Sequence, residues 1–170
     1  MEDHLCLKDH IKNIPDFPKP GVIFRDITPL LLNPRAYRSA IEGFIDHINE
    51  NIVVGIETRG FLFAAPVASR INCPLVLVRK PGKLPREAYT ASYELEYGTS
   101  ELSVHKDIPK GNVIIIDDVL ATGGTMQAAI NVMEQAGCKV TKCGFLIELS
   151  YLKGREKIEK YNPFSLIRYS

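Results

Sequence analysis

The sequence predicts an α/β fold in which a central, mostly parallel β-sheet is flanked by helices, and three observations support this prediction. Short apolar runs such as residues 113–116 lack polar alternation, which suits strands buried on both faces of a sheet. Segments with apolar residues at helical spacing lie between these runs. The resulting alternation of helix and strand is typical of parallel sheets with right-handed crossover connections.

The composition indicates one globular domain without a general affinity for nucleic acid or membranes. The 170 residues, of which 45% are hydrophobic and 24% charged, suffice for one substantial core but not for two ordinary domains. The net charge of +1 means that any anion site must be local. No apolar run has the length of a membrane span, and the first ten residues lack a signal-peptide pattern. The four cysteines show neither CxxC nor zinc spacing, so we expect reduced thiols and a cytoplasmic protein.

The elements can be assigned in chain order. Residues 1–13 can form a short helix. Residues 16–31 are rich in proline and prone to turns at their start, and the simplest interpretation is a surface loop in which Arg25 and Asp26 form an ion pair. Apolar residues at helical spacing predict helices over residues 34–49, 61–68 and 126–137. Continuous apolar runs predict strands over residues 52–56, 74–78, 113–116, 139–149 and 164–169.

A long connection, residues 79–112, separates the second predicted strand from the third. It is rich in proline and glycine at its start, and residues 92–98 and 100–105 alternate like the two arms of a hairpin. A connection of this length inside a compact domain is usually functional and is often a lid. We therefore expect a single domain over residues 1–170, with a flexible lid formed by residues 80–104.

Two aspartates and a loop of small residues follow the most apolar strand. Asp117 and Asp118 are placed where that strand should end, and the loop after them has the sequence ATGGT. Backbone amides at the loop and at the start of the following helix can hold a phosphate, while the carboxylates can accept hydrogen bonds from sugar hydroxyls or bind a metal ion. The alternative is a helix N-cap with solvated acids. The candidate phosphate-binding residues are Ala121, Thr122, Gly123, Gly124 and Thr125.

Two further loops follow predicted strands and carry groups that can bind anions. Ligands of open α/β sheets bind beyond the carboxyl ends of strands. After the second strand come Arg79, Lys80 and Lys83, which suit a polyphosphate unless they form an ordinary solvated loop. After the first strand come Glu57, Thr58 and Arg59 in a tight turn, for which a salt-bridged connection is the alternative.

The predicted lid carries a carboxylate and a phenol that could act on a proton or on a developing cation. These groups are Glu96 and Tyr97, with Glu94 nearby. If the lid closes over a substrate, such groups can take part in acid–base chemistry. An exposed hairpin without a chemical role is the alternative.

At these motifs the chain resembles the type I phosphoribosyltransferases. Residues 113–125, VIIIDDVLATGGT, resemble the signature with which this family binds 5-phosphoribosyl 1-pyrophosphate. Four other pieces resemble the members that use adenine: FPKPGVIFRDITPLL, GIETRGFLFAAPVA, RKPGKLPREAYTASYELEYG and LKGREKI. The resemblance therefore covers nearly the whole chain.

The resemblance implies an activity and a site. The reaction would convert adenine and 5-phosphoribosyl 1-pyrophosphate to AMP and pyrophosphate, with Mg²⁺ as the cofactor. The fold would include an N-terminal hood (residues 1–33). The protein would be a homodimer. Asp117 and Asp118 would bind the ribose hydroxyls, with Mg²⁺ held near them through substrate and water. The implied pyrophosphate-binding residues are Glu57, Thr58, Arg59, Arg79, Lys80 and Lys83. The implied adenine-binding residues are Ile23, Phe24 and Arg25. Glu96, Tyr97 and Arg59 would be catalytic, and a cis peptide bond would join Glu57 to Thr58.

One position bears on the choice of base. Family members that act on 6-oxopurines have an aspartate where this chain has Ala121. A side chain without a titratable group at that position argues against hypoxanthine or guanine as the substrate. A xanthine-type enzyme and a non-catalytic regulator that senses phosphoribosyl pyrophosphate are the alternatives.

Overall fold

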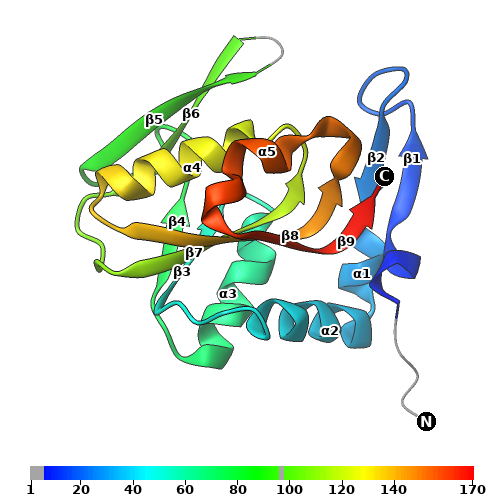
Figure 1. The fold of residues 1–170 in the computed structure, drawn as a ribbon, viewed down its shortest axis with the longest axis horizontal. Coiled ribbons are helices and arrows are strands. Elements are labelled where there is room, and N and C mark those ends of the chain that lie inside the picture. Colours follow the sequence, from blue (N-terminus) through cyan, green and yellow to red (C-terminus); the bar gives the residue numbers. More distant parts are fainter. Residues whose placement is uncertain (1–5, 96–97) are drawn as a thin grey trace.

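The centre of the molecule is a five-stranded sheet in which all neighbouring strands are parallel, in the order β4-β3-β7-β8-β9. The computed structural model describes residues 6–95 and 98–170 (Figure 1). The five strands are β3 (Ile52–Ile56), β4 (Leu75–Val78), β7 (Asn112–Leu120), β8 (Lys139–Leu149) and β9 (Pro163–Tyr169). The predicted α/β fold with a parallel sheet is confirmed.

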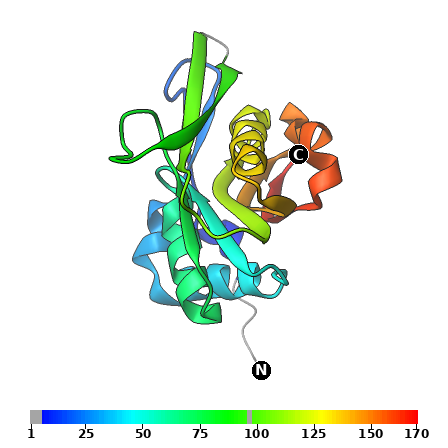
Figure 2. The same ribbon diagram turned by 90° about the vertical axis from the view of Figure 1, so that its left-hand side faces the viewer.

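Helices cover both faces of this sheet, as Figures 1 and 2 show. One face carries α4 (Gly124–Gln135) and α5 (Gly154–Ile158), and the other carries α2 (Pro34–Ile45), α3 (Gly60–Ile71) and the short α1 (Thr28–Leu32). The described residues also form three short turns of 3-10 helix, η1 (Leu7–His10), η2 (Ser150–Leu152) and η3 (Glu159–Tyr161). In the described part of the chain, no helix is long and apolar enough to cross a membrane.

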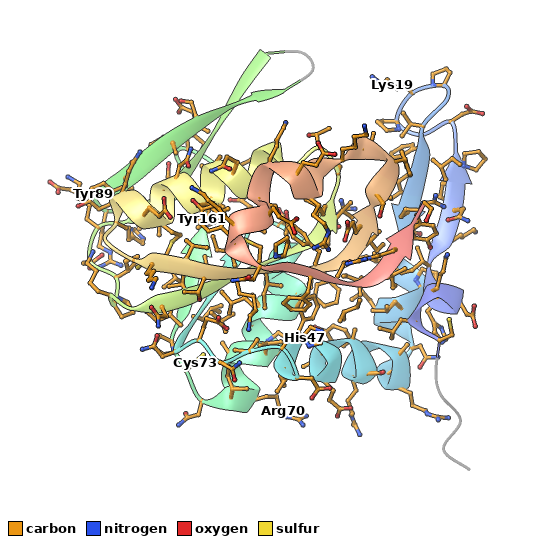
Figure 3. The ribbon with its side chains drawn as sticks, viewed as in Figure 1. Lys19, His47, Arg70, Cys73, Tyr89 and Tyr161 are labelled. Carbon is orange, nitrogen blue, oxygen red and sulfur yellow. The ribbon has the colours of Figure 1, made fainter. Side chains whose placement is uncertain are left out.

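The central strand β7 is buried on both faces, as its unbroken apolar run predicts. Val113 and Ile115 belong to the core that α4 covers, whereas Ile114 and Ile116 belong to the core that α2 and α3 cover. Tyr161 and His47 lie on opposite faces of the sheet in Figure 3. The parallel sheet is thus the middle of three layers around β7, which favours the carboxyl ends of its strands as the place for a ligand.

The strand β7 is longer than the sequence predicts. It runs through Asp117 and Asp118 to Leu120 instead of ending at the first aspartate. The reason is pairing with β8, since Asp117 is opposite Phe145, and Leu120 is opposite Glu148. Both aspartates are therefore held by the sheet rather than by a loop.

The N-terminal region also differs from its prediction. Among the described residues of the predicted short helix, only residues 7–10 are helical, as the 3-10 turn η1, and the predicted surface loop is instead part of an antiparallel pair. This pair, β1 (Lys12–Pro15) with β2 (Ile23–Asp26), stands beside β9 in Figure 1. Arg25 does not pair with Asp26. Instead it donates a hydrogen bond to the Asn13 side chain across the two strands, while Asp26 accepts from the Thr28 backbone amide at 2.9 Å.

The expected hairpin is present as β5 (Ala88–Leu95) and β6 (Gly98–His105), which pair antiparallel and project beyond the sheet (Figure 1). Its base is fixed, because Ala91, Leu102 and Val104 are buried in the core beneath α4. The Ser103 backbone also exchanges hydrogen bonds of 2.9 and 2.7 Å with Arg79, directly after β4. Glu96 and Tyr97 lie outside the described residues.

A buried ion pair fixes the segment after β8. The Glu148 carboxylate is 4% exposed and binds the Arg155 guanidinium through two contacts of 2.9 and 2.6 Å. The Arg155 hydrogen bonds, together with one from Ser165, lower the pKa of Glu148 from 4.5 to about 2. This acid is therefore ionised in the folded protein at every pH at which the unfolded chain is ionised.

We expect Glu148→Gln to lower the free energy of unfolding by about 3 kcal/mol at neutral pH, which is the stabilisation linked to a pKa difference of this size. Because the folded-state pKa is below the unfolded value, the contribution is complete above about 4.5 and is lost as the pH falls toward about 2. Urea unfolding of both proteins across this range measures it. The exposed Glu87, paired with Lys106, provides a matched control: Glu87→Gln should leave stability unchanged.

Candidate active site

Three loops with anion-binding groups meet at one end of the sheet. Because β3, β4 and β7 are parallel, their carboxyl ends lie at the same edge, where ligands of open α/β sheets bind. Directly after these strands come residues 57–59, which lead into α3 at Gly60, residues 79–87, which lead into β5, and residues 121–123, which lead into α4 at Gly124. The structure therefore brings together the loops that the sequence singled out from distant parts of the chain.

The loop after β7 forms a small concave site at the start of α4. A cavity of about 60 Å³ is lined by residues 119–126 and Phe145. Gly123 has a φ of +79°, a left-handed conformation that only glycine adopts without cost, and α4 begins at the next residue. The unpaired amides of the first helical turn face this loop end, which suits a phosphate group.

The two aspartates occupy different environments on β7. Asp117 accepts a hydrogen bond of 2.9 Å from the Asp118 backbone amide, and burial, followed by the neighbouring Asp118 charge, raises its pKa well above the usual value. Asp118 lies 2.7 Å from the Arg59 Nε through its Oδ2. Burial raises the pKa of Asp118 as well, and the Arg59 charge opposes that rise.

Arg59 connects the acids to the N-terminal strand pair. Its guanidinium binds Asp118, and its Cζ is 5.3 Å from the centroid of the Phe24 ring. The side chain is 42% exposed, so it is accessible to a ligand. A single arginine thus touches both the candidate ribose-binding carboxylate and the candidate base-stacking ring.

Glu57 joins the loop after β3 to the loop after β4. Its Oε2 accepts hydrogen bonds from the Arg79 Nε at 3.2 Å and from the Lys80 backbone amide at 3.0 Å. Arg79 also donates to the Lys83 carbonyl at 3.1 Å. The side chains of Lys80 and Lys83 are exposed, so both cations face solvent at this edge. The peptide bond between Glu57 and Thr58 is cis, as the resemblance implies.

The candidate base-binding residues lie on β2, next to this edge. The ring of Phe24 packs edge-on against Phe17, with centroids 5.2 Å apart. The guanidinium of Arg25 stacks on Tyr169, 3.8 Å from the ring centroid, and its Nε is buried without a hydrogen-bond partner among the described residues. Ile23 is 45% exposed at the start of the strand.

Sequence reasoning missed several residues that hold these groups. Asn13 and Tyr169 orient Arg25, and neither has a pattern that could have indicated it, because they come from opposite ends of the chain. Gly60 belongs to the predicted turn after β3, but its close packing on β7 does not follow from the sequence; a β-carbon there would lie 2.7 Å from the Ile116 carbonyl oxygen. The resemblance marks LKGREKI as a motif but does not reveal that its Arg155 pairs with Glu148.

Comparison with known proteins identifies the class. Residues 30–167 match the model of the phosphoribosyl transferase domain, so the chain belongs to the phosphoribosyl transferase family. Within that family it groups with the adenine phosphoribosyltransferases. A curated protein of that name from Roseiflexus sp. (strain RS-1) is 50% identical over 168 residues, which cover 96% of this chain and 98% of the relative.

Solved structures agree with this grouping. The crystal structure of adenine phosphoribosyltransferase from Thermoanaerobacter pseudethanolicus superimposes with a TM-score of 0.91 at 45% identity, covering 96% of this chain and 98% of that one. The enzyme from Saccharomyces cerevisiae, solved with adenine and an imino-altritol bisphosphate, has a TM-score of 0.88 at 38% identity, covering 94% and 96%. The predicted type I phosphoribosyltransferase fold is thereby confirmed.

Proposed function

We propose that the carboxyl edge of the sheet converts adenine and 5-phosphoribosyl 1-pyrophosphate to AMP and pyrophosphate, a purine-salvage reaction. The observation that carries this proposal is the position of Arg59, which contacts Asp118 at 2.7 Å and lies over Phe24 at 5.3 Å. The sugar, the leaving group and the base can therefore all be bound around one residue.

The donor would lie across the three loops. The 5-phosphate binds at residues 121–125, where the cavity and the start of α4 offer amides. The ribose hydroxyls donate to Asp118 and Asp117. The pyrophosphate is bound by Arg59 and by the loop of residues 79–83, which Glu57 holds in place. These cations stabilise the charge that develops as pyrophosphate leaves.

The sites of the acids fit a role for Mg²⁺. Asp117 and Asp118 offer carboxylate oxygens, which are the ligands that a hard cation prefers. Among the described residues, no group of three or more His, Cys, Asp or Glu side chains could hold a metal ion. Mg²⁺ would therefore be held largely by substrate oxygens and water beside Asp117 and Asp118. When bound, it would neutralise charge on the pyrophosphate.

Adenine would stack on Phe24 beneath a hood formed by residues 1–33, and the Ile23 backbone and the Arg25 side chain would help recognise it. Within the lid region of residues 80–104, the part beyond the buried base of the hairpin would close over the site, which excludes water from the developing oxocarbenium ion at C1. Glu96 would be the proton acceptor, and Tyr97 would position the pyrophosphate or stabilise the transition state. We also propose a cytoplasmic homodimer. Two-fold dimers are the commonest soluble homo-oligomers, and the four cysteines are free thiols, as is usual in the cytoplasm.

An assay of nucleotide formation with adenine, hypoxanthine, guanine and xanthine tests the proposal. We expect AMP formation with adenine, dependent on Mg²⁺, and little product from the other bases. A preference for xanthine would favour a xanthine-type enzyme, and the absence of product from every base would contradict the proposed activity.

Phe24→Ala is expected to raise the KM for adenine about tenfold, because a stacked aromatic partner is worth roughly 1 to 3 kcal/mol per base. The KM for phosphoribosyl pyrophosphate should remain close to that of the unmodified enzyme and serves as the internal control. Steady-state kinetics with each substrate varied in turn measure both constants. An unchanged KM for adenine would remove Phe24 from the base site.

A further inference from the structure

The segment of residues 152–158, here called the support segment, packs directly against the proposed phosphate-binding loop. A β-carbon on Gly154 would lie 2.1 Å from the Ala121 carbonyl oxygen and 2.7 Å from the Gly123 amide nitrogen. A β-carbon on Gly123 would lie 2.6 Å from the Gly154 carbonyl oxygen. The two backbones are therefore in direct contact, and no side chain can be placed between them.

The position of Gly154 is fixed by its neighbour, Arg155. The guanidinium binds both oxygens of the buried Glu148 carboxylate and donates a third hydrogen bond, of 2.6 Å, to the Pro163 carbonyl. Ser165 donates to the same carboxylate at 2.7 Å. Arg155 is thus attached to both β8 and β9, and a bidentate pair of this kind fixes orientation as well as distance.

Glu148 is in turn the register partner of Leu120, the last residue of β7. The loop of residues 121–125 starts immediately after Leu120. The loop is therefore connected to the support segment in two ways. Through the sheet, Leu120 is paired with Glu148, which in turn binds Arg155. Directly, the backbone of Gly154 contacts the backbone of the loop.

The other end of the support segment is also fixed. Ile158 is fully buried and Tyr161 is 5% exposed, and both belong to the core that α4 covers. Tyr161 is labelled beside α4 in Figure 3. The segment is thus held at Arg155 and again at Ile158, both shortly after Gly154, so it cannot yield to a displaced loop without disturbing packed groups.

We propose that Gly154 and Arg155 are positioning residues for the phosphate-binding loop, an inference that rests on the proposed function. A loop containing Gly123 and Gly124 is conformationally permissive by itself. Contact with the rigid support segment holds the loop in one conformation, so its amides already point toward the phosphate site. Binding then costs little conformational entropy of the loop.

Gly154→Ala tests this inference, with Gly144→Ala as the matched control. Gly144 is also buried, and a β-carbon there would lie 2.8 Å from the Phe164 ring, on the side of the sheet away from the support segment. Both changes therefore crowd the interior, but only the first displaces the loop. Titration calorimetry with ribose 5-phosphate reports on the loop, and titration with pyrophosphate reports on the loops after β3 and β4.

We expect Gly154→Ala to weaken ribose 5-phosphate binding at least tenfold and to leave pyrophosphate binding unchanged, while Gly144→Ala lowers only the melting temperature. Equal ribose 5-phosphate affinity in Gly154→Ala and the unmodified protein would overturn the inference. Equal loss in both variants would overturn it too, since the cause would then be general destabilisation. If the unmodified protein binds pyrophosphate but not ribose 5-phosphate, the assignment of the phosphate loop fails, and the inference fails with it.

If Gly154→Ala does not fold, a second variant, Arg155→Lys, tests whether the support segment positions the phosphate-binding loop. Arg155→Lys keeps the charge beside Glu148 but loses the bidentate geometry and the bond to Pro163. We expect several-fold weaker binding of ribose 5-phosphate, unchanged binding of pyrophosphate, and a rise in the KM for the donor at nearly constant kcat. Unchanged affinity for ribose 5-phosphate would overturn the role of Arg155.

Discussion

Asp118→Asn is expected to lower kcat/KM for phosphoribosyl pyrophosphate about a hundredfold, while the protein remains folded. Hydrogen bonds to a charged group contribute roughly 1.5 to 3 kcal/mol, and a hundredfold loss corresponds to about 2.7 kcal/mol. The carboxylate is the group that would accept from the ribose, and it also holds Arg59 at 2.7 Å. An asparagine keeps the shape of the side chain but provides neither the charge nor a second acceptor oxygen.

Asp118→Asn should lower kcat/KM without lowering the melting temperature. Burial raises the pKa of Asp118, so keeping it ionised at neutral pH costs free energy in the folded protein. Asparagine removes that cost, and we expect a melting temperature no lower than that of the unmodified enzyme. Asp46→Asn, at the exposed end of α2, is the matched control and should change neither property. Normal kinetics for the donor in Asp118→Asn would exclude the proposed ribose contact.

The sheet could be predicted from the sequence because its central strands are buried on both faces. Burial of that kind requires uninterrupted β-branched and other apolar residues, and residues 113–116 and 52–56 have such runs. The loops that follow could be predicted as one site because parallel strands place their carboxyl ends together. Local pattern and topology thus determine the approximate position of the site.

The contacts within the site could not be predicted in the same way. Arg25 stacks on Tyr169, which is nearly the whole chain away, and Gly154 contacts the loop after β7 through backbone atoms alone. Neither contact requires a periodic pattern or a particular local composition. The strand pair β1–β2 was missed for a related reason, since its pairing depends on cross-strand partners such as Arg25 and Asn13 rather than on apolar alternation.

The close packing of Gly60 on β7 is the source of the second large effect that we expect. A β-carbon on Gly60 would lie 2.7 Å from the Ile116 carbonyl oxygen and 3.1 Å from the Asp117 Oδ1. The colliding atoms include backbone, which cannot rotate away as a flexible side chain can. Gly60→Ala must therefore push the start of α3 away from the end of β7, and this separates Arg59 from Asp118.

We expect Gly60→Ala to lower kcat/KM for both substrates about a hundredfold, with a loss of about 2 kcal/mol in the free energy of unfolding, as is typical of an overpacked core. Gly43→Ala is the matched control, because a β-carbon there meets only the flexible Leu166 side chain, at 3.2 Å. Gly43 is inside α2, where alanine stabilises a helix relative to glycine, so that variant should keep full activity and stability. Full activity in Gly60→Ala would mean that the contact between Arg59 and Asp118 does not depend on close packing of α3 on β7.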